Sequence, residues 1–396
     1  MNPWSGLKKI PRNIWLISFA TLINRSGTMV LPYLVLYLTR NEGITPSKAG
    51  IVLSLYGAGA LITSPFVGKL SDKIGSMRIM KYSLLFTSIT LVCYSFVHEY
   101  LLFLMITLIL SVISEAFRPA NLSYISIESS PEQRKTAFAL NRLAINLGMS
   151  IGPVVGGLLA MFDFSLLFYV NGFSTFTAWV FLVLAKFEPH SSSKLEKDET
   201  IKPDQSISQK PNSILKDKNI LLFYVALVPV MIVFFQHIGA FPLYLVHELK
   251  HTEVIFGLLM AVNTVLIIFI EVPLNNAMSN WSDKKSLVLG SILCGLGYGA
   301  MLISPELWWI IITIVIWTFG EMIFFPASAS YISIVSDESR RGEYMGYFQM
   351  TFSFSFMMGP WIGTLLFENY GAGSVWAVSL LLSLISGFIF LRIRTT

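Results

Sequence analysis

Charged residues are scarce in this sequence, and their scarcity excludes most soluble proteins. Only 13% of the 396 residues are Asp, Glu, Lys or Arg, while 54% are hydrophobic. A soluble domain usually has about 25% charged residues. The composition therefore places most of the chain in a lipid bilayer. The formal net charge of +5 is no sign of nucleic-acid binding, because the basic residues are distributed as a membrane topology requires.

Cysteine is also nearly absent. The two cysteines, Cys93 and Cys294, lie inside apolar runs, where a cysteine usually serves as a small packing residue. The sequence therefore predicts neither a disulfide nor a metal site. It also lacks a phosphate-binding loop, a nucleophile elbow and a paired-cysteine cluster. A channel is not favoured, because the sequence shows neither a pore loop nor a ring of charges.

One motif favours an enzyme. The segment HELKH, His247 to His251, fits the zinc-protease pattern of two histidines four residues apart with a glutamate between them. It lies where the seventh predicted helix meets the outer surface, and no third ligand is evident. A membrane metalloprotease is therefore a minor alternative, and we predict no catalytic residue, metal or cofactor.

Long apolar runs are the abundant feature of the chain. A membrane-spanning helix needs about 20 mostly apolar residues. Twelve such runs can be identified: 13–38, 46–69, 79–97, 100–128, 135–161, 164–187, 219–246, 253–279, 286–304, 306–335, 342–367 and 372–391. The sequence thus predicts an all-α membrane protein with twelve transmembrane helices. The first run is too long for a signal peptide and has no small-residue cleavage site, so we expect a retained helix.

The basic residues predict the orientation. With the N-terminus inside, the inner segments hold 22 of the 28 Lys and Arg residues, and the outer loops hold only Arg40, Lys48 and Lys250. Positively charged loops stay in the cytoplasm. We therefore expect a multi-pass protein of the cell (inner) membrane with both termini cytoplasmic.

A polar segment divides the chain into two related parts. Residues 188–218 are rich in Ser, Lys, Asp and Pro, so we expect a solvated cytoplasmic linker between two six-helix bundles, residues 1–187 and 219–396. The two parts match at an offset of 207 residues, in the pairs Gly50–Gly257, Tyr124–Tyr331, Arg134–Arg341, Gly152–Gly359, Pro153–Pro360 and Gly156–Gly363. Such duplication is typical of transporters, whose substrate site lies between the repeats near the bilayer midplane.

Two glycine-containing stretches carry a family pattern. GKLSDKIGSMR, between the second and third helices, contains Gly68, Asp72, Gly75 and Arg78. It resembles the loop signature of the major facilitator superfamily. GMSIGPVVGG, in the fifth helix, contains Gly148, Gly152, Pro153 and Gly156, and it resembles the motif of that superfamily's proton-coupled exporters. The resemblance covers essentially the whole chain. It implies two pseudo-symmetric bundles, alternating access and the drug:proton antiporter type.

These stretches are candidates for gating. Gly148, Gly152 and Gly156 form one smooth helix face, and Pro153 bends that helix; Gly359 and Pro360 are their counterparts in the second half. In the family this helix lines the seam between the halves, and simple close packing is the alternative. The resemblance makes Asp72, with Arg78, an inner latch, and a solvated surface pair is the alternative. The second half has Asn280 in place of Asp72, so we expect no strong latch there.

Six charged residues fall inside the predicted helices. They are Arg25, Arg118, Arg142, Glu115, Glu271 and Glu321. On insertion scales a central charge costs about 2.5–3.5 kcal/mol, or roughly 15–20 kcal/mol for six. They must therefore face the protein interior or a wet cavity.

The three glutamates are the candidates for proton coupling. Glu321 is the first choice, because its helix holds no basic neighbour and apolar surroundings disfavour the ionised form of a carboxyl group. Glu271 is the second choice, and it could pair with Arg142, since the family fold brings the fifth and eighth helices together. Glu115 is the third, and its spacing of three residues favours an ion pair with Arg118.

Polar residues near these charges are candidates for a substrate cavity. The predicted set is Asn24, Arg25, Arg118, Asn121, Arg142, Asn146, Gln236 and His237. An arginine offers a bidentate site for a carboxylate or phosphate, although a glutamate could instead neutralise Arg25. A lone histidine such as His237 is more often a hydrogen-bonded core residue than a switch.

The sequence thus favours a proton-coupled secondary transporter that exports small organic, amphipathic solutes by alternating access. The alternative is proton-coupled uptake or exchange of an anionic or zwitterionic metabolite through a cavity with Arg25 and His237. Cation export would require an accessible, unpaired carboxylate, and anion transport would require Arg25 to face the cavity unpaired. The expected partners are a small-molecule substrate, protons and the lipid bilayer, without nucleic acid, and the expected state is a monomer.

Overall fold

The computed structural model describes residues 10–130, 133–188, 217–278, 280–336 and 341–394. Within these ranges the chain is helical and forms no β-strand. The side chains of residues 64–65, 68–69, 71–72, 134–135 and 341–342 lie outside the description. So does most of the predicted linker, residues 189–216.

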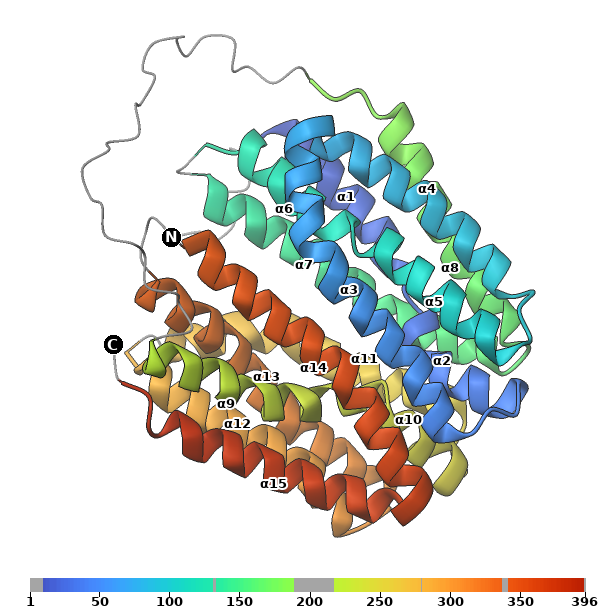
Figure 1. Ribbon diagram of the computed structural model, residues 1–396, viewed down its shortest axis with the longest axis vertical. Coiled ribbons are helices and arrows are strands. Elements are labelled where there is room, and N and C mark those ends of the chain that lie inside the picture. The colour runs from blue at the N-terminus through green and yellow to red at the C-terminus, as the bar shows by residue number, and fades with distance from the viewer. Residues whose placement is uncertain (1–9, 131–132, 189–216, 279, 337–340, 395–396) are drawn as a thin grey trace.

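The helices of the first half follow the predicted runs closely. They are α1 (Arg12–Ser26), α2 (Val30–Leu36), the π-helical turn η2 (Tyr37–Asn41), α3 (Pro46–Ile74), α4 (Ser76–Tyr94), α5 (Tyr100–Ser114), α6 (Phe117–Glu128), α7 (Arg134–Ala160) and α8 (Ser165–Leu184). In Figure 1 this half, coloured from blue to green, fills one side of the molecule.

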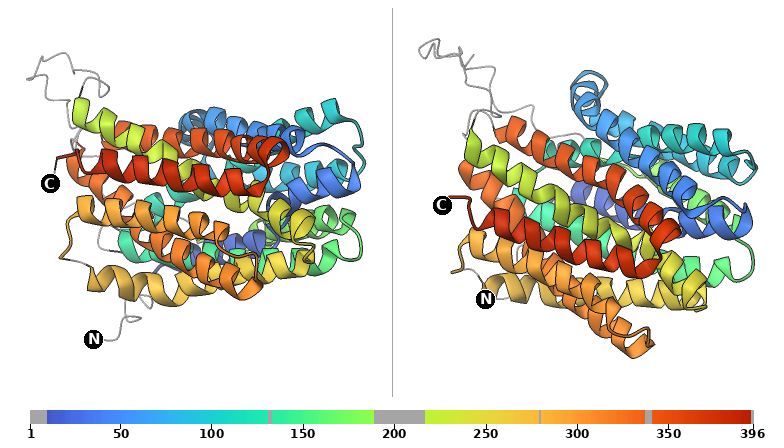
Figure 2. Two further views of the ribbon diagram at one scale, coloured as in Figure 1. Left: turned by 90° about the horizontal axis from the view of Figure 1, so that it is seen from below. Right: turned by 60° about the horizontal axis from the view of Figure 1, so that its bottom comes forward.

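The second half fills the other side and is coloured from yellow-green to red (Figure 1). Its helices are α9 (Lys218–Phe234), η5 (Phe235–His237), α10 (Ala240–Leu243), the π-helical η6 (Tyr244–Glu248), α11 (Glu253–Ala277), α12 (Asp283–Gly299), η7 (Ala300–Leu302), α13 (Leu307–Val335), α14 (Arg341–Tyr370) and α15 (Ala372–Phe390). Figure 2 shows that the long helices of both halves run roughly side by side.

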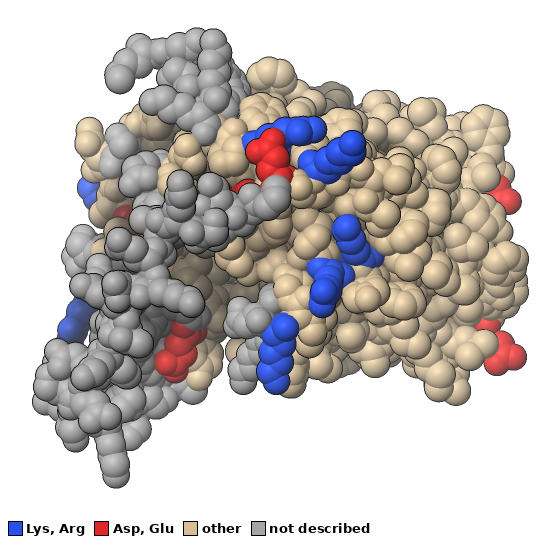
Figure 3. Space-filling model, turned by 90° about the horizontal axis from the view of Figure 1, so that it is seen from above, with Lys and Arg blue, Asp and Glu red and all other residues tan. Residues whose placement is uncertain are grey.

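The surface fits a membrane environment. Among the described residues, ten helical stretches are long and apolar enough to cross a bilayer. On the face seen in Figure 3, a broad band carries no charged side chain, and the basic side chains all lie to one side of it. The predicted all-helical membrane architecture is confirmed. The runs 46–69 and 79–97 form α3 and α4 but are not among the ten, so the count of twelve crossings stays a prediction.

One predicted run is interrupted where a charge lies. The run 100–128 divides into α5 and α6 at Glu115 and Ala116. Pro119 has no N–H to donate to the carbonyl of Glu115, four residues earlier, and its ring crowds that carbonyl. The break therefore falls at Glu115 and Ala116.

Matched residues of the two halves make matched contacts. Gly50 on α3 meets Thr364 and Trp361 of α14, whereas its counterpart Gly257 on α11 meets the carbonyl of Pro153 on α7. The π-helical turns η2 and η6 each span five residues and lie 207 residues apart. The sequence repeat therefore corresponds to a structural repeat.

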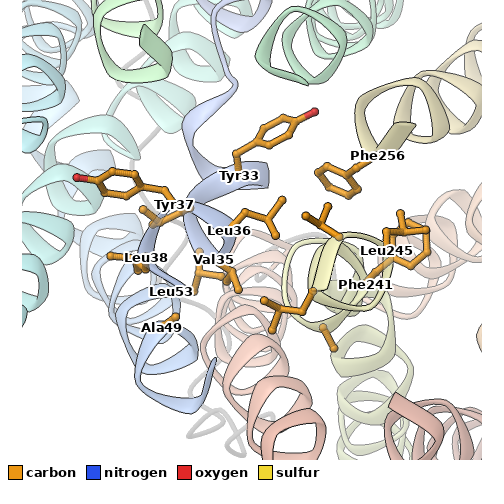
Figure 4. Close-up of a cluster of buried hydrophobic side chains, with 14 of the residues drawn as sticks. Tyr33, Val35, Leu36, Tyr37, Leu38, Ala49, Leu53, Phe241, Leu245 and Phe256 are labelled. Carbon is orange, nitrogen blue, oxygen red and sulfur yellow. The ribbon is translucent and has the colours of Figure 1, made fainter. Parts of the chain in front are cut away.

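A buried hydrophobic cluster joins the halves near η2 and η6. We call this end of the molecule the outer end, after the predicted orientation, and the opposite end the inner end. Figure 4 shows Leu36 and Tyr33 of the first half facing Leu245, Phe241 and Phe256 of the second. The rings of Tyr33 and Phe256 lie 5.1 Å apart, edge to face. Such packing brings the two halves into contact at the outer end.

Candidate functional site

Polar contacts reinforce the closure at the outer end. The guanidinium of Arg40 on η2 forms an ion pair with the carboxylate of Glu253, the first residue of α11. The hydroxyl of Thr39 lies 3.2 Å from Nε2 of His247 on η6. The hydroxyl of Tyr33 lies 2.7 Å from the carbonyl oxygen of Pro153 and 3.1 Å from that of Glu253. An ion pair and hydrogen bonds therefore join the two halves at this end.

Toward the inner end a cavity of about 450 Å³ opens between the halves. Its polar lining includes Arg25 of α1, Arg118 and Asn121 of α6, and Arg142 and Asn146 of α7. Its aromatic lining consists of Phe117, Phe138, Phe325, Phe348 and Phe352. The volume falls within the range of about 300–1,000 Å³ typical of small-molecule sites. The molecule is therefore closed at its outer end and hollow toward its inner end.

Five of the eight predicted cavity residues line this space. They are Arg25, Arg118, Asn121, Arg142 and Asn146. Asn24 lines a neighbouring cavity of about 110 Å³, formed mostly by the first half, which also includes Arg25, Tyr56 and Glu115. Arg25 and Phe117 border both spaces.

Gln236 and His237 lie elsewhere in the described part of the chain. Nε2 of Gln236 donates to the carbonyl oxygens of Ile232, at 3.0 Å, and Gly359, at 2.9 Å. Nδ1 of His237 lies 2.6 Å from the carbonyl oxygen of Phe234, and its ring stacks near Trp317. Neither residue lines a described cavity. These contacts fit the interpretation of His237 as a hydrogen-bonded core residue.

The three arginines of the central cavity differ in their partners. Arg142 donates to Glu271 on α11, as predicted from the family fold. Within the described residues, neither Arg25 nor Arg118 has a carboxylate within 4.0 Å. Nε of Arg25 is buried without a hydrogen-bond partner. The guanidinium of Arg118 instead lies 5.9 Å from the ring centre of Phe352, across the seam between the halves.

The predicted ion pair between Glu115 and Arg118 is not formed. Oε1 of Glu115 accepts a hydrogen bond of 2.9 Å from the hydroxyl of Tyr56 on α3. The spacing of three residues favours an ion pair only on a continuous helix, and the helix is broken between α5 and α6 at Glu115. The prediction was wrong because the effect of Pro119 on the helix was not considered.

Glu321 lies on α13 and accepts a hydrogen bond from a neutral donor on α11. Nδ2 of Asn263 lies 2.9 Å from Oε2 of Glu321 and 2.9 Å from the hydroxyl of Thr318. No basic residue of the described chain pairs with Glu321 within 4.0 Å. Glu321 lines none of the described cavities. Of the three predicted glutamates, only Glu115 borders a cavity, and only Glu271 is ion-paired.

Sequence reasoning missed Asn263 and Tyr56, the hydrogen-bond partners of Glu321 and Glu115. Each lies on a helix distant in sequence from its glutamate, at separations of 58 and 59 residues. A signal was present for Asn263, since an amide within an apolar run costs free energy unless it is hydrogen-bonded.

The predicted glycine face of α7 packs closely against α1, α2 and the turn between them, within the first half. A Cβ at Gly148 would lie 2.5 Å from Cβ of Arg25, and one at Gly152 would lie 2.4 Å from the carbonyl oxygen of Thr28. Gly156 faces Met29 and Tyr33. In the second half a Cβ at Gly359 would lie 2.9 Å from Cβ of Phe235. Only glycine permits these approaches.

The predicted latch lies partly outside the described residues. The side chains of Gly68 and Asp72 are not described. Arg78 is exposed on α4, and Gly75 before it has φ of +89°, which side chains other than hydrogen rarely allow. The latch therefore stays a prediction.

The HELKH segment has no metal-site geometry. In the described part of the chain, no group of three His, Cys, Asp or Glu side chains is placed to hold a metal ion. His247 contacts Thr39, so this segment contributes to the contact between the halves at the outer end.

The sequence is similar to that of known membrane transporters along most of its length. A model described as the Major Facilitator Superfamily matches residues 14–269 and 233–396. An uncharacterised MFS-type transporter, YqjV of Bacillus subtilis (strain 168), is 24% identical over 381 residues, which are 94% of this chain and 90% of that protein. A Na(+), Li(+), K(+)/H(+) antiporter of Planococcus maritimus is 22% identical, covering 93% and 92% of the two chains.

Two further similarities concern a protein named for multidrug resistance and a solved structure. Multidrug resistance protein 2 of Bacillus subtilis (strain 168) is 23% identical over 334 residues, covering 82% of this chain and 81% of that protein. Among solved structures, the nucleoside transporter NupG superposes with a TM-score of 0.80 at 13% identity, covering 97% of this chain and 99% of that one. At that identity the likeness concerns the fold alone.

Proposed function

Because this chain belongs to the major facilitator superfamily, we propose that it is a proton-coupled secondary transporter that exports small, amphipathic organic solutes by alternating access. The family makes it a membrane transporter and not an enzyme. The observation that carries the proposal is the 450 Å³ cavity between the halves, with arginines on one part of its wall and phenylalanines on another.

Alternating access is supported by the asymmetry of the two ends. The Arg40–Glu253 ion pair and the apolar cluster around Tyr33 join the halves at the outer end, while the cavity lies toward the inner end. In our proposal residues 1–187 and 219–396 move as two bundles joined by the cytoplasmic linker 188–218. Separation of the outer contacts and closure of the cavity would then give the outward-facing state.

Proton coupling is assigned to Glu321. It is a carboxyl group within the membrane that accepts a hydrogen bond from the neutral Asn263 and pairs with no basic residue of the described chain. Such a group can bind a proton without first breaking an ion pair. Glu271, by contrast, is paired with Arg142, and its protonation would release that contact between the halves. We therefore keep Glu271 as the second candidate.

Export is supported by the relatives and by α7. The relatives include proteins named for multidrug and quinolone resistance. The close packing of the glycine face of α7 against α1 and α2 suits a rigid unit that moves as one body. The proposed direction is from the cytoplasm outward, with protons moving inward.

The proposal is tested in liposomes with an imposed pH gradient. A pH-sensitive dye reports proton movement as each of a panel of amphipathic solutes is added to wild type, Glu321→Gln and the matched control Glu306→Gln, which changes an exposed carboxylate before α13. We expect solute-dependent proton movement in wild type and Glu306→Gln, and none in Glu321→Gln. Concentrative transport by Glu321→Gln at the wild-type rate would reject the assignment.

A second candidate function is uptake or exchange of an anionic or zwitterionic metabolite. It is supported by Arg25, which lines the cavity without an ion pair to any described residue. His237, predicted to share that role, lines no described cavity. The direction of solute movement under opposite pH gradients separates this candidate from export.

A further inference from the structure

The central cavity has more positive than negative charge on its walls. Arg142 is neutralised by Glu271, so Arg25 and Arg118 remain. The acidic group that faces them is Glu115, which shares one cavity with Arg25 and another with Arg118. Two guanidinium groups therefore face one carboxylate, and that carboxylate already accepts a hydrogen bond from Tyr56.

An uncompensated charge at this depth needs a counterion. Arg118 lies ten residues from the inner end of α6 at Glu128, or about 15 Å along the helix. A charge in the membrane interior needs water, an opposite charge or hydrogen-bond acceptors, and the ring of Phe352 near Arg118 replaces these only in part. Nε of Arg25 is buried and has no hydrogen-bond partner, although a guanidinium can bind an anion through two parallel hydrogen bonds.

The remaining walls suit an apolar group. Phe117 and Phe138 come from the first half, and Phe325, Phe348 and Phe352 from the second. Arg118 lies above the ring of Phe352, so the charged and aromatic parts of the wall adjoin. A ligand that carries an anionic group next to an apolar or aromatic body would contact both.

The seam is also hollowed between α6 and α14, near the apolar surface of the molecule. A second space of about 210 Å³ lies between α6 and α14, and it shares Arg118, Leu122 and Gln349 with the central cavity. Leu122 is 41% exposed and Met350 44% exposed at its rim. On this side of the seam α14 packs along α3, and on the opposite side α7 packs along α11, where the Arg142–Glu271 pair joins the halves. The space between α6 and α14 therefore lies beside a closely packed helix pair.

We propose that the central cavity binds an amphipathic organic anion, whose charged group is held by Arg118 and Arg25 and whose apolar part passes from the bilayer through the space between α6 and α14. The proposal rests on the proposed function for its biological use. It names the charge of the solute and the path by which it reaches the cavity.

The expected negative charge of the solute is tested by measuring ligand binding in the absence of a proton gradient. Full-length protein in lipid nanodiscs is titrated with dansylaminoundecanoic acid and with its methyl ester, which has the same apolar body without the charge. We expect the acid to bind at least about tenfold more tightly, as a charge-assisted hydrogen bond to arginine allows. Arg118→Gln and Arg25→Gln should each remove most of this preference. Arg118→Lys should keep part of it, and Arg392→Gln, an exposed arginine beside Phe388, should keep all of it.

Binding of the ester reports whether each variant is folded. A preference for the acid that survives both Arg118→Gln and Arg25→Gln, or an ester that binds wild type as tightly as the acid, would overturn the assignment. Glu321→Gln should bind the acid as wild type does, because the measurement involves no proton gradient. Concentrative transport by Glu321→Gln at the wild-type rate, with intact acid preference, would therefore reject the coupling scheme and leave this inference standing.

Entry of the solute from the bilayer is tested by narrowing the space between α6 and α14. Met350→Trp should slow association of the membrane-partitioned dansyl acid by about fivefold or more, as steric gating affects the on-rate. It should leave the association of water-soluble phenylbutyrate unchanged. Met345→Trp, on the same helix and 38% exposed but outside both cavities, should affect neither. Equal slowing of both anions, or of neither, would mean that the solute reaches the cavity from water.

Discussion

Arg142 on α7 donates a hydrogen bond to Glu271 on α11 and so forms an ion pair across the two halves of the molecule. The two partners differ in their access to solvent, because the side chain of Arg142 is 57% exposed and that of Glu271 only 10%. Arg142 borders the central cavity, where water can solvate it, whereas Glu271 depends on its partner. The pair therefore couples the inner part of the seam to the ionisation of one buried carboxylate.

This asymmetry predicts unequal effects of removing the two partners. Arg142→Gln should lower the unfolding temperature more than Glu271→Gln, because it leaves a buried carboxylate without its counter-charge. The unfolding temperature of the double variant should fall by less than the sum of the two single shifts. The difference should correspond to an interaction free energy of about 0.5–3 kcal/mol between the two side chains. Thermal unfolding of the four proteins in detergent gives the comparison. Additive shifts would show that the pair contributes nothing, as expected for the exposed Arg12–Glu188 pair.

A second prediction concerns the outer end. Glu253→Gln should weaken the contact with Arg40, and should favour opening of the outer end. An ion pair with one buried partner is worth about 1–2 kcal/mol here, or a factor of roughly 5–30 in the ratio of states. A cysteine placed by Leu36→Cys, fully buried in the outer cluster (Figure 4), should then react faster with a membrane-impermeant maleimide.

That labelling experiment needs two controls. Cys93 is exposed and is first replaced by serine, while Cys294 is buried. Arg12→Gln removes a surface ion pair with Glu188 whose partners are 62% and 65% exposed, and it should leave the labelling rate unchanged. Labelling of Leu36→Cys at the same rate with and without Glu253→Gln would mean that the apolar cluster alone closes this end.

The helices could be predicted from the sequence because lipid imposes a simple constraint. A run of about 20 apolar residues satisfies its backbone hydrogen bonds only as a helix, and each predicted run from 13–38 to 372–391 contains helix. The break at Glu115 was predictable from Pro119 but was overlooked. Hydropathy does not contain that information, since it is averaged over a window of about 19 residues that spans the break.

The candidate site was predicted only in part. The Arg142–Glu271 contact followed from the family fold, because that fold brings two particular helices together. The partners of Glu115 and Glu321 did not follow, since Tyr56 and Asn263 reach them from other helices. The rotation of each helix about its axis decides such contacts, and a uniformly apolar run does not fix that rotation. For the same reason His237 was expected in a cavity and lies among aromatic rings.

The last prediction concerns glycines that allow the halves to close. A Cβ at Gly57 on α3 would lie 2.5 Å from the backbone nitrogen of Met357 on α14, and one at Gly257 on α11 would lie 2.4 Å from the carbonyl oxygen of Pro153 on α7. Both contacts are with backbone of the opposite half, which cannot rotate away as a side chain can. Gly57→Ala and Gly257→Ala should therefore hold the outer seam apart.

In transport assays each of these two variants should lose at least about tenfold in rate, since a displacement of an ångström in a packed interface cannot be absorbed locally. Leu36→Cys should become reactive in both backgrounds. Gly373→Ala is the matched control, because a Cβ there would meet only Leu302 at 3.7 Å, an ordinary contact, and transport should stay near wild type. If Leu36→Cys becomes reactive in Gly57→Ala and Gly257→Ala while transport stays normal, the closed outer seam is not a state through which the transport cycle must pass. If Leu36→Cys stays unreactive, the added Cβ atoms do not hold the seam apart.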